Sequence, residues 1–109
     1  MRKRFLRLIP LGILSCLTVP GVTQAKSDPA RLFATNCTLC HGADGSGDTA
    51  SGKAMHAKDL RSDEVQQQSD AALSEVITKG RGKMPAFGAK IKADDVTKLV
   101  AYIRSLAKK

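Results

Sequence analysis

A C-x-x-C-H pentad, formed by Cys37, Cys40 and His41, constrains this chain more than any other feature. On one helical turn, cysteines three positions apart point the same way, and the histidine lies one position further round. The pattern is typical of covalent attachment of a c-type haem, in which each thiol adds to one vinyl group of the porphyrin. We therefore expect one haem c with its iron, held covalently by Cys37 and Cys40, with His41 as an axial iron ligand.

Other uses of a C-x-x-C pair fit the sequence less well than haem attachment does. A thioredoxin-like redox pair follows a strand inside a βαβ unit, whereas the residues before Cys37 are predicted to form a helix. A structural zinc site needs four ligands at tetrahedral spacing, and His56 is the only histidine beyond the pentad. A disulfide between Cys37 and Cys40 would close a very small loop. Haem attachment is therefore the preferred interpretation of the motif.

The first 25 residues have the pattern of an export signal. A cluster of arginine and lysine residues precedes an apolar stretch over residues 6–19, and small residues then lead to a cleavage site after Ala25. Pro10 and Pro20 interrupt the apolar stretch, which is also short for a membrane span. We therefore expect residues 1–25 to be a signal peptide that is removed, rather than a retained anchor. Residues 26–109 then form one small domain, which is exported to the periplasm.

Charge and aromatic content limit what the mature domain can do and how it folds. The full chain has 18 Lys and Arg against 10 Asp and Glu, and four of those cations belong to the predicted signal. No basic stripe with interleaved aromatic residues is present, so nucleic-acid binding is not expected. The mature aromatic residues are Phe33, Phe87 and Tyr102. Because this is little for a core, we expect the domain to depend on the porphyrin for its folding.

The mature chain is predicted to be all-α, with three to four short helices wrapped around one covalently bound haem. Asp28 is a good N-cap for the first helix, and Gly80 is a good stop for the helix that Ser69 or Asp70 begins. No segment shows the alternation of a half-buried strand. The other predicted segments are helices over residues 29–36, 62–68 and 93–106, and loops over residues 42–52 and 81–92.

The second axial position of the iron has four candidate occupants: Met84, Met55, His56, or no protein ligand at all. Met84 is the predicted ligand because it lies in a loop between helices and is followed by Pro85, which stiffens the backbone. It is also far enough from His41 in the chain to reach the opposite face of the ring. Met55 and His56 follow the pentad closely, on the side of the ring that His41 occupies. We therefore expect His41 and Met84 as the axial ligands.

Further motifs follow the pentad in a fixed order along the mature chain. With Phe33 before the pentad, they are Gly42, Gly45, Gly47, Asp59, Leu60, Leu73, Val76, Ile77, Gly80, residues 84–87 and residues 100–104. Together with the pentad they resemble the monohaem class I c-type cytochromes of the small bacterial periplasmic kind. The resemblance covers essentially the whole mature domain. It implies that the first and last helices cross, with Phe33 and Tyr102 near the crossing.

Two positions depart from the pattern of that family. Pro29 stands where many members have a glycine at the helix crossing. Residues 53–55 stand where many members have a proline whose carbonyl accepts a hydrogen bond from the ligand histidine. An acceptor for His41 is still expected, because such a contact orients the imidazole and tunes its basicity. The sequence leaves the identity of that acceptor open.

Iron bound by His41 and Met84 has both axial positions filled, so no substrate reaches it and its oxidation state changes with little change in geometry. No nucleophile–base pair or carboxylate dyad accompanies the motifs. We therefore expect a protein that is not an enzyme. The predicted function is a soluble, monomeric one-electron carrier between periplasmic or membrane redox partners, such as an oxidase or a reductase, with no small-molecule substrate. The alternative is a ligand-binding or peroxidase-like haem protein with a labile sixth position.

Five lysines fall in segments expected near the edge of the haem. They are Lys53, Lys58, Lys79, Lys83 and Lys90. Each one alone is expected to be a solvated surface residue. Together they would steer the carrier toward an acidic patch on its partner, with fast and salt-sensitive association.

Overall fold

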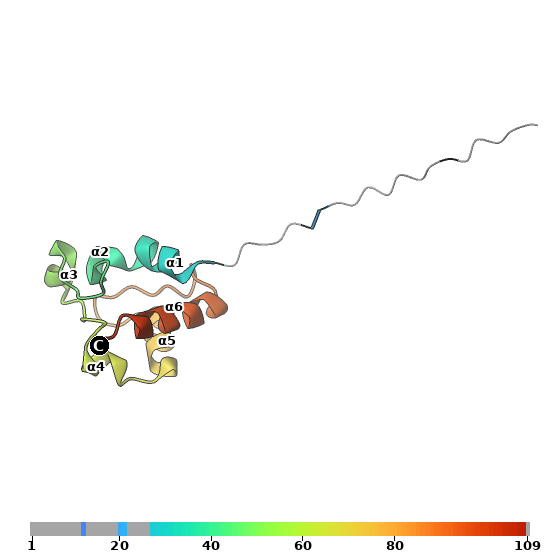
Figure 1. The fold of residues 1–109 in the computed structure, drawn as a ribbon. Coiled ribbons are helices and arrows are strands. Elements are labelled where there is room, and N and C mark those ends of the chain that lie inside the picture. Colours follow the sequence, from blue (N-terminus) through green and yellow to red (C-terminus); the bar gives the residue numbers. More distant parts are fainter. Residues whose placement is uncertain (1–11, 13–19, 22–26, 109) are drawn as a thin grey trace, which may run out of the picture.

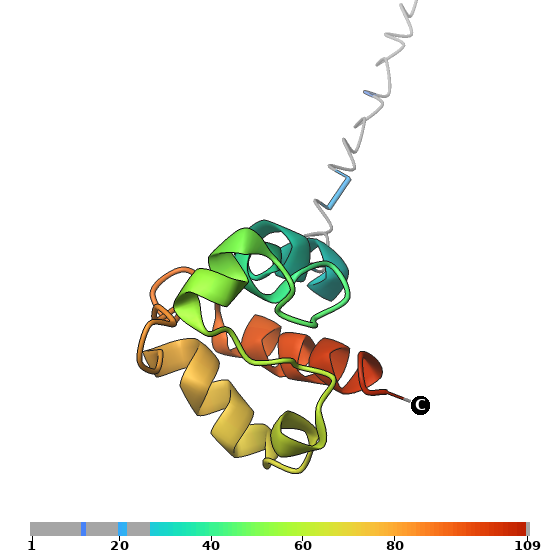
Figure 2. The same cartoon turned by 90° about the vertical axis from the view of Figure 1, so that its left-hand side faces the viewer.

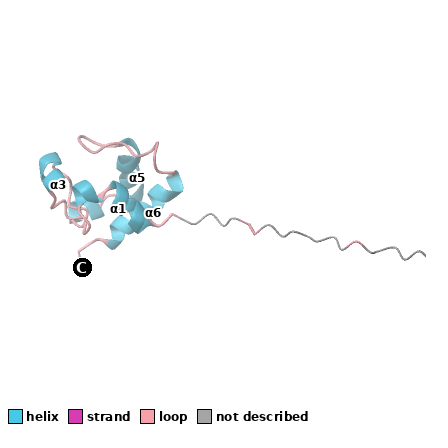
Figure 3. Ribbon diagram, turned by 90° about the horizontal axis from the view of Figure 1, so that it is seen from above, coloured by secondary structure: helices cyan, strands magenta, loops and turns pink. Residues whose placement is uncertain are grey.

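The computed structural model describes residues 27–108 together with Gly12, Pro20 and Gly21, so the signal peptide predicted over residues 1–25 lies almost entirely outside the described residues. Within residues 27–108 the chain consists of helices and loops, with no strand (Figure 3). The all-α prediction is confirmed. The helices are α1 (Pro29–Asn36), α2 (Thr38–His41), α3 (Ala50–Met55), α4 (Asp63–Gln66), α5 (Asp70–Lys79) and α6 (Ala93–Ser105).

Side-chain caps begin the helices where the sequence predicts them. The Asp28 carboxylate accepts a hydrogen bond from the N–H of Ala30 at the start of α1, and Ser62 and Ser69 cap α4 and α5 in the same way. Gly80, with φ of +74°, ends α5. In the described part of the chain, no helix is both long enough and apolar enough to cross a membrane.

The segment over residues 42–52 is not entirely a loop, because α3 begins at Ala50. Thr49 explains this difference: its hydroxyl accepts a hydrogen bond of 2.8 Å from the N–H of Gly52 and donates one of 2.8 Å to the carbonyl of Leu39. The threonine therefore caps α3 and ties it to α2 at once.

The predicted helix over residues 62–68 is shorter than expected and ends at Gln66. With α2, these one-turn helices raise the number of elements above the three to four predicted.

Helix α6 lies between α1 and α5 (Figures 1 and 2) and carries the apolar stripe around which both pack. Its buried side chains are Val96, Leu99, Val100 and Ile103. Phe33 of α1 is 1% exposed, and its ring centroid lies 5.0 Å from that of Tyr102. The contact between the first and last helices, with Phe33 and Tyr102 at it, is therefore as the family resemblance implies.

Arg104, in the last turn of α6, ties that helix to α4 and α5. Its guanidinium donates to the carbonyls of Gln66 and Gln68, and it also lies 2.8 Å from a carboxylate oxygen of Asp70. The side-chain amide of Gln66 donates in return to the carbonyl of Ile103, at 3.0 Å. A planar group with several donors suits this arrangement, because two carbonyls at the end of α4 and the Asp70 carboxylate at the start of α5 converge on it.

Replacing Arg104 with methionine is expected to lower the free energy of unfolding of the holo-protein by about 2 kcal/mol, because two carbonyls lose their donor. Urea denaturation followed by circular dichroism measures this loss. Lys79→Met is the matched control, since Lys79 pairs with Glu75 on an exposed surface and its loss should cost about 0.5 kcal/mol or less. Equal effects of the two substitutions would contradict the role given to Arg104.

Candidate functional site

The pentad lies on one wall of a cavity of about 730 Å³. Cys37 joins α1 to α2, and the N–H of His41 donates to the carbonyl of Cys37 at 2.9 Å, so the motif forms one helical turn. Cys37, Cys40 and His41 are half-buried and all line the cavity. The turn therefore presents both thiols and the imidazole to the same space, as the spacing predicts.

The opposite walls of the cavity are apolar core side chains from the three longer helices. They include Phe33 of α1, Leu73 and Ile77 of α5, and Leu99 and Ile103 of α6. The volume is within the range of about 300–1,000 Å³ that is usual for ligand and cofactor sites. A large apolar plate joined to Cys37 and Cys40 would fill space that the core itself leaves open. The residues present therefore fit a haem.

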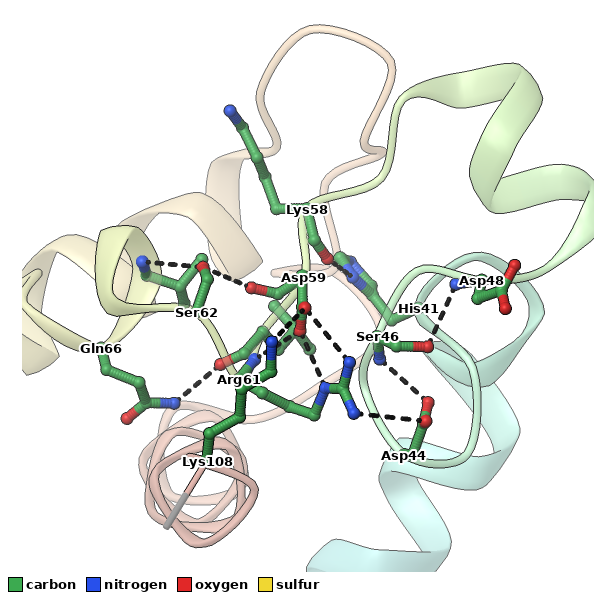
Figure 4. Close-up of polar contacts among 12 residues, drawn as sticks. His41, Asp44, Ser46, Asp48, Lys58, Asp59, Arg61, Ser62, Gln66 and Lys108 are labelled. Carbon is green, nitrogen blue, oxygen red and sulfur yellow. Dashed lines mark hydrogen bonds and ion pairs between the residues drawn. The ribbon is translucent and has the colours of Figure 1, made fainter.

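His41 is held in one orientation by a backbone carbonyl. Its Nδ1 lies 2.9 Å from the carbonyl oxygen of Lys58 (Figure 4). Because a carbonyl can only accept, this hydrogen bond requires the proton on Nδ1 and leaves the lone pair of Nε2 for a metal. Lys58 therefore supplies the acceptor whose identity the sequence leaves open. Any residue type has a carbonyl, so the side chains gave no signal for it.

Met84 lines the same cavity from a loop with well-defined backbone contacts. Arg81 and Met84 exchange two backbone hydrogen bonds, of 3.1 and 2.9 Å, across a tight turn. Beyond the methionine, the N–H of Phe87 donates to the carbonyl of Ile77 at 2.9 Å and so fastens the loop to α5. Gly80 allows this arrangement, because a Cβ there would lie 2.6 Å from the carbonyl oxygen of Met84.

The rival candidates Met55 and His56 also line the cavity, at the end of α3. Met55 is 50% exposed, whereas Met84 is half-buried and packs against the core cluster. His56 is exposed and ends α3 in the left-handed conformation, with φ of 54°. Burial and the anchored loop thus distinguish Met84 from its rivals, although all three residues border the same space.

The two thiols of the pentad have different surroundings. Burial, with a smaller contribution from the neighbouring Cys40, raises the pKa of the Cys37 thiol to about 11.

A helical domain that packs around an apolar cavity, with a C-x-x-C-H turn on the cavity wall, defines the class of c-type cytochromes. The sequence profile of the family described as "Cytochrome C oxidase, cbb3-type, subunit III" matches residues 24–103. The chain belongs to this family of c-type cytochromes. It therefore has a covalently bound haem c with iron, and it carries electrons between redox protein partners.

Curated relatives and a solved structure agree with this assignment. Cytochrome c6 of Microcystis aeruginosa is 33% identical over 82 residues, which are 75% of this chain and 98% of the relative. The FixP subunit of the cbb3-type cytochrome c oxidase of Azorhizobium caulinodans is 35% identical over 89 residues, and the match spans only 29% of its length. The KustC0563 c-type cytochrome has a TM-score of 0.70 at 31% identity, over 75% of this chain and 100% of that one.

Proposed function

We propose that this protein is a soluble, monomeric, periplasmic one-electron carrier, whose haem is attached through Cys37 and Cys40 and whose iron is bound by His41 and Met84. The observation that supports this most is the convergence of these four residues on one apolar cavity, with His41 already oriented by Lys58. The alignment with cytochrome c6 over 98% of that protein also supports an electron carrier of this size.

The same proposal includes the processing of the chain. Residues 1–25 are a signal peptide that is removed, and residues 26–109 are the cytochrome domain. The cation-rich start, the apolar stretch and the small residues before Ala25 support this division.

The chain's own residues carry out four tasks in this function. The haem iron, when bound, supplies the change of oxidation state by one electron. Cys37 and Cys40 would hold the porphyrin in place, and His41, oriented by Lys58, would bind the iron. Met84 would add a soft thioether sulfur, a ligand that favours the ferrous state. The apolar walls from α1, α5 and α6 exclude water from the site.

Reaction with small ligands separates an electron carrier from a ligand-binding or peroxidase-like haem protein. With both axial positions occupied by the chain, the reduced holo-protein should bind carbon monoxide slowly and the ferric protein should turn over little hydrogen peroxide. Stopped-flow absorption measures both rates. Rapid carbon monoxide binding would show that the sixth position is labile and would favour the second class.

Ion pairs within the chain distinguish among the five lysines of the basic docking surface that the sequence suggests. Three of the five lysines pair with carboxylates of this chain: Lys53 with Asp48, Lys58 with Glu64 and Lys79 with Glu75. Lys83 and Lys90 make no ion pair with any described residue, and neither does Arg81. These three cations lie in the loop that carries Met84. We propose that this loop faces an acidic surface on the redox partner.

Charge reversal at Lys90 is expected to slow oxidation of the reduced protein by the anionic probe hexacyanoferrate about threefold at low salt, with a weaker salt dependence. Lys53→Glu changes the net charge equally but lies in α3, outside the loop that carries Met84, so it should have less than half that effect. Stopped-flow rates at increasing ionic strength test this. Equal slowing by both variants would show that only net charge matters, and the docking assignment would then be wrong.

A further inference from the structure

The segment that supplies the acceptor for His41 is fixed by hydrogen bonds on both sides of its backbone. The carbonyl of Asp59 accepts from the N–H and the hydroxyl of Ser62, at 3.1 and 2.7 Å. The carbonyl of Leu60 accepts from the side-chain amide of Gln66, at 2.7 Å. The N–H of Leu60 donates to Gly45 in the glycine-rich loop, at 2.8 Å. The segment therefore has a well-defined path behind the imidazole.

Arg61 holds the side chain of Asp59, the residue that follows Lys58 (Figure 4). Its Nε and Nη2 donate to the two carboxylate oxygens of Asp59 at 3.0 and 3.3 Å, and its backbone N–H donates to the same group at 2.9 Å. These hydrogen bonds keep the pKa of Asp59 below its usual value. A forked guanidinium makes such a two-point contact, whereas an ammonium group is a single point charge.

The same guanidinium also reaches the glycine-rich loop next to the pentad. Its Nη1 lies 3.6 Å from a carboxylate oxygen of Asp44. That carboxylate accepts from the N–H of Ser46 at 3.0 Å, so it caps a turn of the loop. Arg61 is 30% exposed, compared with 64% for Asp44, so the ion pairs are partly shielded from water. Arg61 thus connects the loop after His41 with the segment that contacts His41.

Rotation about one bond of Asp59 moves the acceptor of His41. The carbonyl of Lys58 belongs to the peptide that enters Asp59, so it turns with the N–Cα bond of Asp59. Ser62 holds the carbonyl of Asp59 and Arg61 holds its carboxylate, so the Cα of Asp59, at which the entering peptide ends, is held in place. The packing is close here as well: a Cβ on Gly47 would lie 2.8 Å from the carbonyl oxygen of Ala57.

We infer that Arg61 is a positioning residue for the axial histidine: by holding Asp59 and Asp44, it fixes the Lys58 carbonyl against Nδ1 of His41 and so tunes the reduction potential. The inference rests on the proposed role of His41 as an iron ligand. Hydrogen bonding at Nδ1 makes the imidazole a stronger electron donor, which stabilises ferric iron and lowers the potential. A looser hydrogen bond should therefore raise the potential.

The sign of the change in reduction potential distinguishes the positioning role of Arg61 from a purely electrostatic effect of its charge. Arg61 is a cation, and removing a nearby positive charge by itself stabilises ferric iron and lowers the potential. Loss of positioning acts in the opposite direction. Arg61→Met removes both the charge and the fork, whereas Arg61→Lys keeps the charge and removes only the fork. Lys108→Met is the matched control, because Lys108 lies 3.7 Å from the same Asp59 carboxylate but makes a single contact with it.

The experiment measures the reduction potential of each holo-variant and, by NMR of protein labelled with ¹⁵N-histidine, the solvent exchange of the Nδ1 proton of His41. Arg61→Met and Arg61→Lys should both raise the potential and speed the exchange about tenfold, the factor that corresponds to one hydrogen bond. Lys108→Met should leave the exchange unchanged. Circular dichroism and the haem absorption spectrum verify that each variant folds.

Two results would overturn the inference: a lower potential in Arg61→Met with unchanged exchange, or wild-type behaviour of Arg61→Lys. If Arg61→Met yields no holo-protein, Arg61→Lys alone decides. The proposed function fails on a different observation. If the His41 ring in ferric wild-type protein shows no paramagnetic shift, then His41 is not an iron ligand, whatever the Arg61 variants do.

Discussion

Replacing Cys37 and Cys40 together with alanine is expected to yield a chain that carries no covalent haem and is largely unfolded. The reason is the cavity of about 730 Å³, which borders core residues from all three longer helices. Without the haem, the apolar core side chains that line this space would be exposed to water at a cost of several kcal/mol, which is comparable with the whole free energy of unfolding of a small domain. The domain has no disulfide within its described residues to offset that loss.

Circular dichroism of the double variant, compared with wild-type holo-protein at equal concentration, measures the remaining helix. Leu39→Ala is the matched control, because Leu39 lies between the two cysteines and is 75% exposed. It should keep both the haem and the helical signal. Near-native helicity in the double variant would contradict the dependence of the fold on haem.

Met84→Ala is expected to open the sixth position of the iron while the haem stays attached. The reduced variant should bind carbon monoxide rapidly, which the wild type should not. Its reduction potential should fall on the order of 0.1 V, since axial ligands tune haem potentials over a range of about 0.8 V. The fall follows from the loss of the soft thioether, which favours the ferrous state.

Met55→Ala is the control for this prediction, because Met55 borders the same cavity from the end of α3. Its substitution should change neither carbon monoxide binding nor the potential appreciably. If Met55→Ala rather than Met84→Ala opens the iron, the ligands are misassigned. A labile site in the wild type would instead favour a ligand-binding protein.

The sequence was sufficient for the parts of the fold that depend on local patterns. Asp28, Ser62 and Ser69 are caps in the structure because a short polar side chain can satisfy a free N–H at a helix start wherever it stands. The apolar stripe of α6 is buried for an equally local reason, since its spacing matches the helical period. The contact of Phe33 with Tyr102 came from the family resemblance.

The sequence was insufficient where contacts join distant segments through the backbone. Helix α3 is tied to α2 by a hydrogen bond from Thr49 to Leu39, ten residues earlier, which no local propensity encodes. The acceptor of His41 is a backbone carbonyl 17 residues away. From the sequence alone, Arg61 is indistinguishable from an ordinary surface cation, because its contacts with Asp59 and Asp44 exist only in the folded chain. The spacing of Asp59 and Arg61, two residues apart, was the one sequence signal for their contact.

The proposed docking surface is a second feature for which the sequence was insufficient, because the sequence does not show which charges are paired. A count of lysines near the expected haem edge treats all five alike, but three of them are paired with carboxylates of the same chain. Such pairs involve exposed side chains and contribute little to stability. They do reduce the positive field around those lysines, so of the five only Lys83 and Lys90, in the loop that carries Met84, have no ion pair with a described residue.

The ferric absorption spectrum tests the central claim, a haem iron held by His41 and Met84, most directly. A sulfur-to-iron charge-transfer band at long wavelength reports the thioether bond. We predict that the wild-type protein and Met55→Ala show this band and that Met84→Ala lacks it. A wild-type spectrum without the band, or a band that survives in Met84→Ala, would contradict the account.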